Sequence, residues 1–216
     1  MLFRRRRSYT RTEILEAAGK AQARGRTKKA IAHYKKVLKA NPGDHVVHAK
    51  AAPLFARTKQ FSESWSSFRA AGRGYAEKGF EEKALGVYTQ ATRYIPREIG
   101  AWEAVTSLQL ARGLDADAVK TLIKGHRNFT HRSLRPKAIQ LLRRAREISP
   151  WNFEVTFELA RLLSKTGEAE EALRLLCGLA ERARGRDLRR VRGALLRLSP
   201  TAGSLWRWLS SSVFTA

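Results

Sequence analysis

The fold is decided by the stretch from Phe68 to Pro96, which reads FRAAGRGYAEKGFEEKALGVYTQATRYIP. Small residues such as Ala71 and Ala84 allow two antiparallel helices to approach closely, and the larger apolar residues between them fill the space. Gly79 lies where a tight turn requires a permissive backbone. Pro96 ends the second helix, because the residue before a proline is driven out of the helical region. The stretch therefore predicts two helices joined by a tight turn.

The same residues resemble the tetratricopeptide repeat, a helix–turn–helix unit of about 34 residues. The positions that carry the resemblance are Phe68, Ala71, Gly72, Tyr75, Gly79, Ala84, Tyr88, Ala91 and Pro96. Residues 12–42 and 152–180 also fit the pattern, whereas residues 125–135 fit it poorly. The resemblance extends over residues 12–200 and implies an all-α, right-handed solenoid of antiparallel helices that serves as a protein-interaction scaffold.

A longer period of 54 residues also runs through the chain. The prolines that mark it are Pro42, Pro96, Pro150 and, after only 50 residues, Pro200. The same shift aligns His48 with Trp102, a position where the repeat family often carries Trp. A repeat of about 34 residues plus one extra helix of about 20 accounts for this length. We therefore expect a first repeat at 12–42 and three copies of a three-helix module at residues 44–96, 98–150 and 152–200.

This pattern makes specific predictions about helices, turns and buried positions. We expect at least ten helices and no sheet. Turns are predicted near residues 25, 43, 59, 79, 97, 113, 134, 151 and 167. Asp44 is predicted to cap the helix that follows it, since an Asp side chain accepts from the free amides of a helix N-terminus. Ala30, Ala84 and Ala138 are predicted to be buried where helices meet.

The charge of the chain points to an acidic partner. Its net charge is +24, and its 29 arginines outnumber its 14 lysines. This balance predicts attraction to an acidic protein, to nucleic acid or to an anionic membrane. The basic residues gather in segments 1–39, 118–146 and 181–197. Each segment is interpreted either as a docking face or as an ordinary solvated surface.

Individual arginines are candidates for binding an acidic segment, because a guanidinium pairs bidentately with a carboxylate. Members of the resembling family that hold a terminal carboxylate use a Lys and an Asn four residues apart on a first helix. Arg69 and Arg73 stand at those positions in the central repeat, so that Lys–Asn pair is absent here. We expect these two residues and Arg161 to bind an acidic segment. The candidates from the second basic segment are Arg127, Arg143, Arg144 and Arg146.

The two ends of the chain differ from the repeats. Residues 1–11 contain five arginines and predict an exposed basic arm. Residues 201–216 are rich in apolar residues and predict either a capping helix or a docking segment for a protein or a membrane interface. On a helix, Trp206 and Trp208 point in different directions. We expect Trp208 to pack on the last module and Trp206 to be exposed and available to a partner.

Nothing in the sequence predicts a catalytic, cofactor or metal site. His45 and His48 share a helix face, but no further ligand stands at metal-binding spacing. The single cysteine, Cys177, is interpreted as a buried small apolar residue. No apolar run is long enough to cross a bilayer, and no secretory signal follows the first arginines, so a cytoplasmic location is expected.

The leading hypothesis is a non-enzymatic scaffold or adaptor that binds an acidic protein or serves as a basic subunit of a larger assembly. The alternative is a basic protein that associates with nucleic acid or an anionic membrane. Aromatic residues are not interleaved with the basic runs as stacking platforms for single strands require, which lowers the nucleic-acid version.

Overall fold

The computed structural model describes residues 10–200 and residue 203. This part of the chain contains eleven α-helices and one short 3₁₀-helix, and it contains no strand. The prediction of an all-α fold with at least ten helices is therefore confirmed. The chain divides into two compact units, one up to Leu108 and one from Gln109 onward, which we describe separately.

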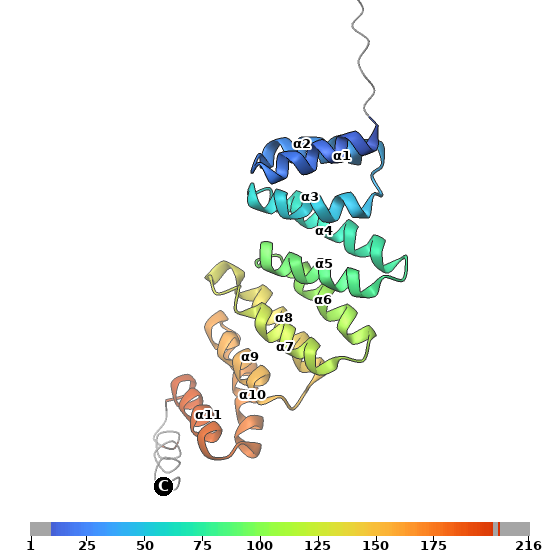
Figure 1. Ribbon diagram of the computed structural model, residues 1–216. Helices are drawn as coiled ribbons and strands as arrows, with labels where there is room; N and C mark the ends of the chain where they lie inside the picture. Colours follow the sequence, from blue (N-terminus) through green and yellow to red (C-terminus); the bar gives the residue numbers. More distant parts are fainter. Residues whose placement is uncertain (1–9, 201–202, 204–216) are drawn as a thin grey trace, which may run out of the picture. The chain divides into compact units, whose positions relative to one another are not determined.

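The helices of the first unit lie side by side in chain order (Figure 1). They are α1 (Arg11–Ala23), α2 (Thr27–Ala40), α3 (His45–Arg57), α4 (Phe61–Ala76) and α5 (Glu81–Tyr94). Helix α6 (Ile99–Ala111) runs across the boundary between the units. From α1 to α5, each helix packs on the next, as expected for a solenoid in which each helix buries its apolar face against its neighbours.

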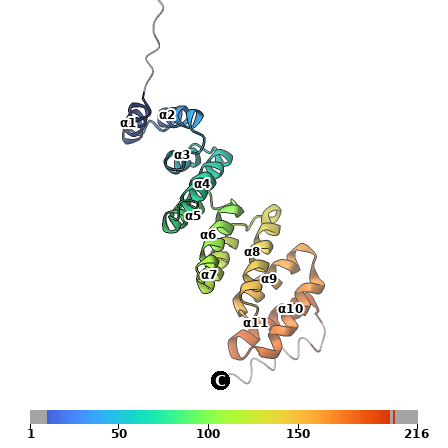
Figure 2. The ribbon, with the colours of Figure 1, turned by 90° about the vertical axis from the view of Figure 1, so that its right-hand side faces the viewer.

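The helices of the second unit also follow one another side by side in chain order. The view turned by 90° shows them (Figure 2). Its elements are α7 (Asp115–His126), η1 (Arg132–Leu134), α8 (Arg135–Ile148), α9 (Phe153–Thr166), α10 (Ala169–Arg182) and α11 (Gly185–Leu198). The segment 125–135, which fits the repeat poorly, contains η1 and a fully buried ring, Phe129. A buried aromatic residue thus anchors the least regular connection of this unit.

Polar side chains cap the helices at three starts. Thr10 and Glu13 form a capping box, in which each side chain bonds the backbone amide of the other residue. Asp44 Oδ1 accepts from the Val47 amide at 3.1 Å, which confirms the predicted cap of α3. Asn152 caps α9 in the same way at Val155.

The turns follow from residues with special backbone preferences. Gly79, between α4 and α5, has a φ of +76°, which a side chain would strain. Helix α5 ends at Tyr94, just before Ile95 and Pro96, as the proline predicts. The turn between α3 and α4 differs, because there Lys59 adopts a positive φ of 62° without being glycine. Turn placement therefore depends mainly on backbone chemistry that can be recognised in the sequence.

Small residues line the helix contacts in both units. Ala30 and Ala84 are fully buried in the first unit, and Ala138 is buried in the second, as predicted. The buried core of the second unit includes the leucines Leu142, Leu159, Leu163 and Leu176. The interpretation of Cys177 is wrong, because its side chain is exposed on α10. Its neighbours Leu175 and Leu176 lie on the buried face of α10. Each further residue is rotated by about 100° around the helix axis, so Cys177 points away from the core.

Three helices begin at a spacing of 54 residues, the length of the predicted modules. Helices α3, α6 and α9 begin at His45, Ile99 and Phe153. The division of the chain into three 54-residue, three-helix modules remains a prediction. Of the predicted terminal segments, residues 1–9 and Trp206 with Trp208 lie outside the described residues. Arg11, the last residue of the predicted arm, is the first residue of α1.

Candidate partner-binding sites

Arg69 and Arg73 lie one turn apart on α4, and both are exposed. The Tyr88 hydroxyl of α5 donates to the Arg69 carbonyl at 3.4 Å, so the backbone of α4 is fixed at this point. Burial raises the pKa of Tyr88, and the two nearby arginines oppose that rise. Arg73 approaches Glu77 at 3.8 Å, a long contact between two exposed groups that adds little stability. The two guanidinium groups are therefore accessible to a ligand.

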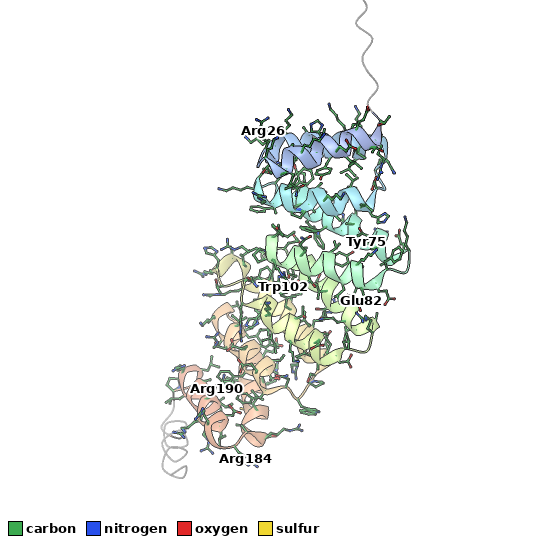
Figure 3. The ribbon with its side chains drawn as sticks, in the orientation of Figure 1. Arg26, Tyr75, Glu82, Trp102, Arg184 and Arg190 are labelled. Carbon is green, nitrogen blue, oxygen red and sulfur yellow. The ribbon has the colours of Figure 1, made fainter. Side chains whose placement is uncertain are left out.

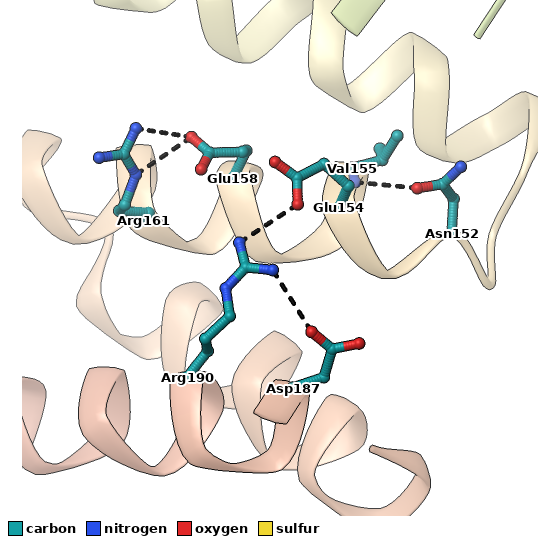
Figure 4. Close-up of polar contacts among 7 residues, drawn as sticks. All are labelled: Asn152, Glu154, Val155, Glu158, Arg161, Asp187 and Arg190. Atoms are coloured by element: carbon teal, nitrogen blue, oxygen red, sulfur yellow. Dashed lines mark hydrogen bonds and ion pairs between the residues drawn. The ribbon is translucent and has the colours of Figure 1, made fainter. Parts of the chain in front are cut away.

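Arg161 is already paired within the chain. Its guanidinium donates twice to one oxygen of Glu158, at 2.7 and 3.0 Å, as the close-up shows (Figure 4). Arg127, which caps the end of α7, is exposed. Both arginines act on buried His126, whose pKa is lowered by burial first and by these two charges to a smaller extent, against the opposing effect of Glu158. The structure thus brings Arg127 and Arg161 near the same histidine.

The three arginines predicted on α8 differ in their surroundings. Arg143 bridges α8 to α10 by ion pairs with Glu168 at 3.0 Å and Glu171 at 2.8 Å. Burial alone would lower the pKa of Arg143, but these two carboxylates raise it overall. Arg144 is half-buried and has an interaction within the chain. Arg146 is exposed and faces a cavity beside Trp151.

A similar network holds α11 against α9. Arg190 of α11 reaches Glu154 of α9 at 3.2 Å and Asp187 at 3.4 Å (Figure 4). Its guanidinium also lies over the rings of Phe153 and Phe157, at 5.2 and 4.6 Å from their centres. Arg190 therefore stabilises the packing of α11 on α9, although it belongs to the third basic segment of the sequence.

The described residues contain a basic groove on α1 and α2 that sequence reasoning did not single out. We call it the α1–α2 groove, and its volume is about 470 Å³. Its cationic residues are Lys20, Arg24, Arg26, Lys29 and Lys36. Ile14, Ala17 and Ala21 supply apolar surface, and Arg26 marks the end of the helix pair in Figure 3. The only acidic residue in the groove is Glu13, which serves in the capping box of α1.

None of these five cations forms an ion pair with another described residue. Their mutual proximity is reflected at His33, whose pKa is lowered by burial and then by Lys36 and Lys29. The signal available in the sequence was the basic segment 1–39. That segment could not indicate which of its cations share a groove.

A second cavity, which we call the Trp151 cavity, lies in the second unit. Its volume is about 510 Å³, and its lining includes Trp151, Thr156 and Leu175. Arg146, Arg174, Arg182 and Arg184 are its cationic residues. Of these, only Arg146 was predicted to bind a partner. Arg184 lies near the turn between α10 and α11, as labelled in Figure 3.

Two absences hold for the part of the chain that the structure describes. No cluster of three or more His, Cys, Asp or Glu side chains is arranged to hold a metal ion there. None of the helices in that part is both long and apolar enough to cross a membrane.

Comparison with known families adds to this geometry. The profile of the tetratricopeptide repeat family matches residues 136–198, which span α8 to α11. Residues 136–198 are therefore of the tetratricopeptide-repeat type. No curated protein sequence matches the chain.

Several solved structures resemble this chain at low identity. The protein MamA is 16% identical over 94% of this chain and 90% of its own, with a TM-score of 0.32. PilF of Pseudomonas aeruginosa is 17% identical over 94% and 89%, with a TM-score of 0.32. A thermophilic tetratricopeptide protein of Thermus thermophilus is 18% identical over 94% and 88%, again with a TM-score of 0.32. At these values the likenesses carry no argument about function.

Proposed function

We propose that this protein is a non-enzymatic scaffold that binds an acidic protein partner. The tetratricopeptide-type repeats support a role in protein–protein interaction. The observation that supports an acidic partner is the α1–α2 groove, where five cations lie beside apolar side chains and none of them pairs with a carboxylate of the described residues. The cytoplasmic location expected from the sequence is part of the same proposal.

The groove suits an acidic helix or strand that also carries apolar residues. Like charges gathered at one site raise the free energy of the unbound protein, and a ligand carboxylate relieves that repulsion. Ile14, Ala17 and Ala21 can meanwhile take up apolar side chains of the same ligand. A phosphate backbone uses the charges but gains nothing from an apolar floor, so a protein partner is favoured over nucleic acid.

The test uses the full chain and a synthetic helical peptide that carries Glu on one face and Leu on the other. We expect binding by isothermal titration calorimetry to weaken by about tenfold or more when salt is raised from low to physiological levels. Replacing Glu by Gln in the peptide should abolish binding. Short duplex DNA and phosphatidylserine vesicles are titrated in parallel, and binding to either that exceeds peptide binding would favour the alternative function.

A matched pair of variants separates the groove from the net charge. The first variant combines Arg24→Glu, Arg26→Glu and Lys29→Glu within the groove. The control combines Arg57→Glu, Lys78→Glu and Arg97→Glu, which are exposed and lie outside the groove. Both change the net charge equally. The groove variant should lose the peptide and the control should keep most of its affinity, whereas equal losses would mean that only overall charge matters. Arg143 is unsuitable for such a test, because its replacement breaks the ion pairs to α10.

A further inference from the structure

Three prolines are each followed, six residues later, by the fourth residue of a helix. In α3 that residue is His48, whose Nε2 lies 2.9 Å from the Pro42 carbonyl oxygen. In α6 it is Trp102, whose Nε1–H donates to the Pro96 carbonyl at 2.9 Å. In α9 it is Thr156, after Pro150. Its hydroxyl is too short to repeat the contact, and Oγ1 has no hydrogen-bond partner although the residue is only 5% exposed.

The Trp151 cavity lies where that ring is missing. Pro150 and Thr156 both line it, together with Phe153 from the first turn of α9. Across the cavity α10 contributes Leu175 and Gly178. A Cβ atom added at Gly178 would meet nothing within 4 Å, so the space beside this helix is open. A volume of about 510 Å³ accommodates one large apolar side chain with neighbouring backbone.

The rim of the cavity is cationic and aromatic. Arg146, Arg174 and Arg182 line it, and none of them pairs with a carboxylate of the described residues. The Arg182 guanidinium lies 3.5 Å from the ring centre of Trp151, whose side chain is 73% exposed. Stacking on an indole holds the guanidinium in place while leaving its edges free to donate.

Other polar groups of the cavity are already partnered or of opposite sign. Arg184 donates to the backbone carbonyls of Glu181 and Ala183, at 3.0 and 2.8 Å. Asp187 is engaged by Arg190, and the Glu181 carboxylate remains at the rim. A ligand with a few discrete carboxylates can avoid these acids, whereas a continuous phosphate backbone cannot. Among the residues that line the cavity, Trp151 is the only exposed aromatic ring, and one of its faces is covered by Arg182. This arrangement also disfavours a stacked single strand.

We propose that the Trp151 cavity binds an acidic peptide segment of the partner by inserting one aromatic side chain of that segment. The ring enters beside Thr156, in the space that Trp102 fills with its own ring in α6. Carboxylates that flank the ring pair with Arg146, Arg174 and Arg182, and the unpartnered Thr156 hydroxyl donates to the inserted segment after rotation. This inference rests on the proposed function and names a second site, separate from the α1–α2 groove.

The experiment titrates the full chain with a synthetic peptide in which one Trp is flanked by Glu and Asp, followed by calorimetry. Thr156→Trp places in the cavity the ring that the preceding module carries, and Gly178→Leu fills it from the opposite wall. Gly19→Leu is the control, because this helical glycine also faces open space but does not line the cavity. We expect both cavity variants to weaken binding at least about tenfold, while the control stays within about twofold.

Substitutions in the peptide and at the rim of the cavity test the same inference. Replacing the peptide Trp by Ala, or Arg174 by Glu, should also weaken binding at least about tenfold. Thermal melts identify any variant that fails to fold. If Thr156→Trp does not fold, the affinity of Gly178→Leu tests the inference in its place. Unchanged affinity in the folded cavity variants would overturn the inference, and so would tighter binding of oligothymidylate than of the peptide. If the cavity variants bind the peptide normally and the groove variant does not, the inference about the cavity fails but the proposed function stands. If the protein binds no acidic peptide at either site, both fail.

Discussion

His48 and Trp102 make the same contact 54 residues apart, each from a ring nitrogen to the carbonyl oxygen of a proline six residues earlier. Both distances are 2.9 Å. Since a carbonyl oxygen only accepts, Nε2 of His48 carries the hydrogen, which leaves Nδ1 buried without a partner. Two different rings therefore close equivalent loops, whereas Thr156, which stands at the third such position, is too short to do so.

This contact predicts that Trp102→Phe destabilises the protein. The change removes the donor of a mostly buried hydrogen bond, so the loss should be about 1–2 kcal/mol beyond the cost of the smaller ring. Trp65→Phe is the control, because it removes the same atoms from an indole that forms no hydrogen bond with a described residue. Urea denaturation measures both variants. Equal losses would show that the bond to Pro96 contributes nothing.

The close approach of α4 and α5 predicts a severe effect of Gly72→Ala. A Cβ atom at Gly72 would lie 2.2 Å from the Tyr88 ring, which is buried and bonded through its hydroxyl to the Arg69 carbonyl. The overlap should cost about 1–3 kcal/mol. Gly86→Ala on α5 meets open space and should instead stabilise by about 0.5–1 kcal/mol. Thermal melts that rank the two variants in the opposite order would contradict this packing.

Asp44 predicts a dependence of stability on acid. Burial alone would raise the pKa of Asp44, but the Arg11 guanidinium, 2.7 Å away, and the Val47 amide lower it overall. A carboxyl whose folded pKa is depressed contributes stability above its ordinary pKa, and this contribution is lost as the pH falls through the folded value. Asp44→Ala should cost about 1–2 kcal/mol at neutral pH through the lost helix cap. In urea titrations below pH 4, the difference in the free energy of unfolding between Asp44→Ala and the wild type should shrink. A constant difference would contradict the lowered pKa of Asp44.

His126 predicts a second loss of stability, at milder acid. Its pKa in the folded protein is lowered by burial and by Arg127 and Arg161, which outweigh Glu158. Below the ordinary value of 6.5, the unfolded chain therefore binds a proton that the folded chain does not. Stability should fall between neutral pH and pH 5, and His126→Leu should flatten that slope. Parallel slopes for the variant and the wild type would show that this histidine is not responsible.

The sequence was sufficient where backbone chemistry decides the structure. Gly79 and Pro96 mark a turn and a helix end by their own backbone preferences, and Asp44 caps by reaching a neighbour three residues away. These are local effects, so a linear pattern contains them. Apolar neighbours do not by themselves predict burial of Cys177, because the buried face of α10 passes through Leu175 and Leu176 and leaves Cys177 on the outer side.

The candidate sites depend on contacts that a linear pattern does not contain. Arg143 appeared free because its acidic partners lie 25 and 28 residues further on. Thr156 looked unremarkable, although its small size leaves room for the Trp151 cavity. Charge counting located the basic segments, but only the packing of helices shows which cations are already paired.

The exposed position of Cys177 makes the protein well suited to spectroscopic labelling. It is the only cysteine of the chain, and its thiol is accessible on the helix that carries Gly178. A maleimide dye would therefore couple at one defined place without any engineered residue. Such a dye stands one residue from the wall of the Trp151 cavity, so its emission can report occupancy of that cavity in the unmodified sequence.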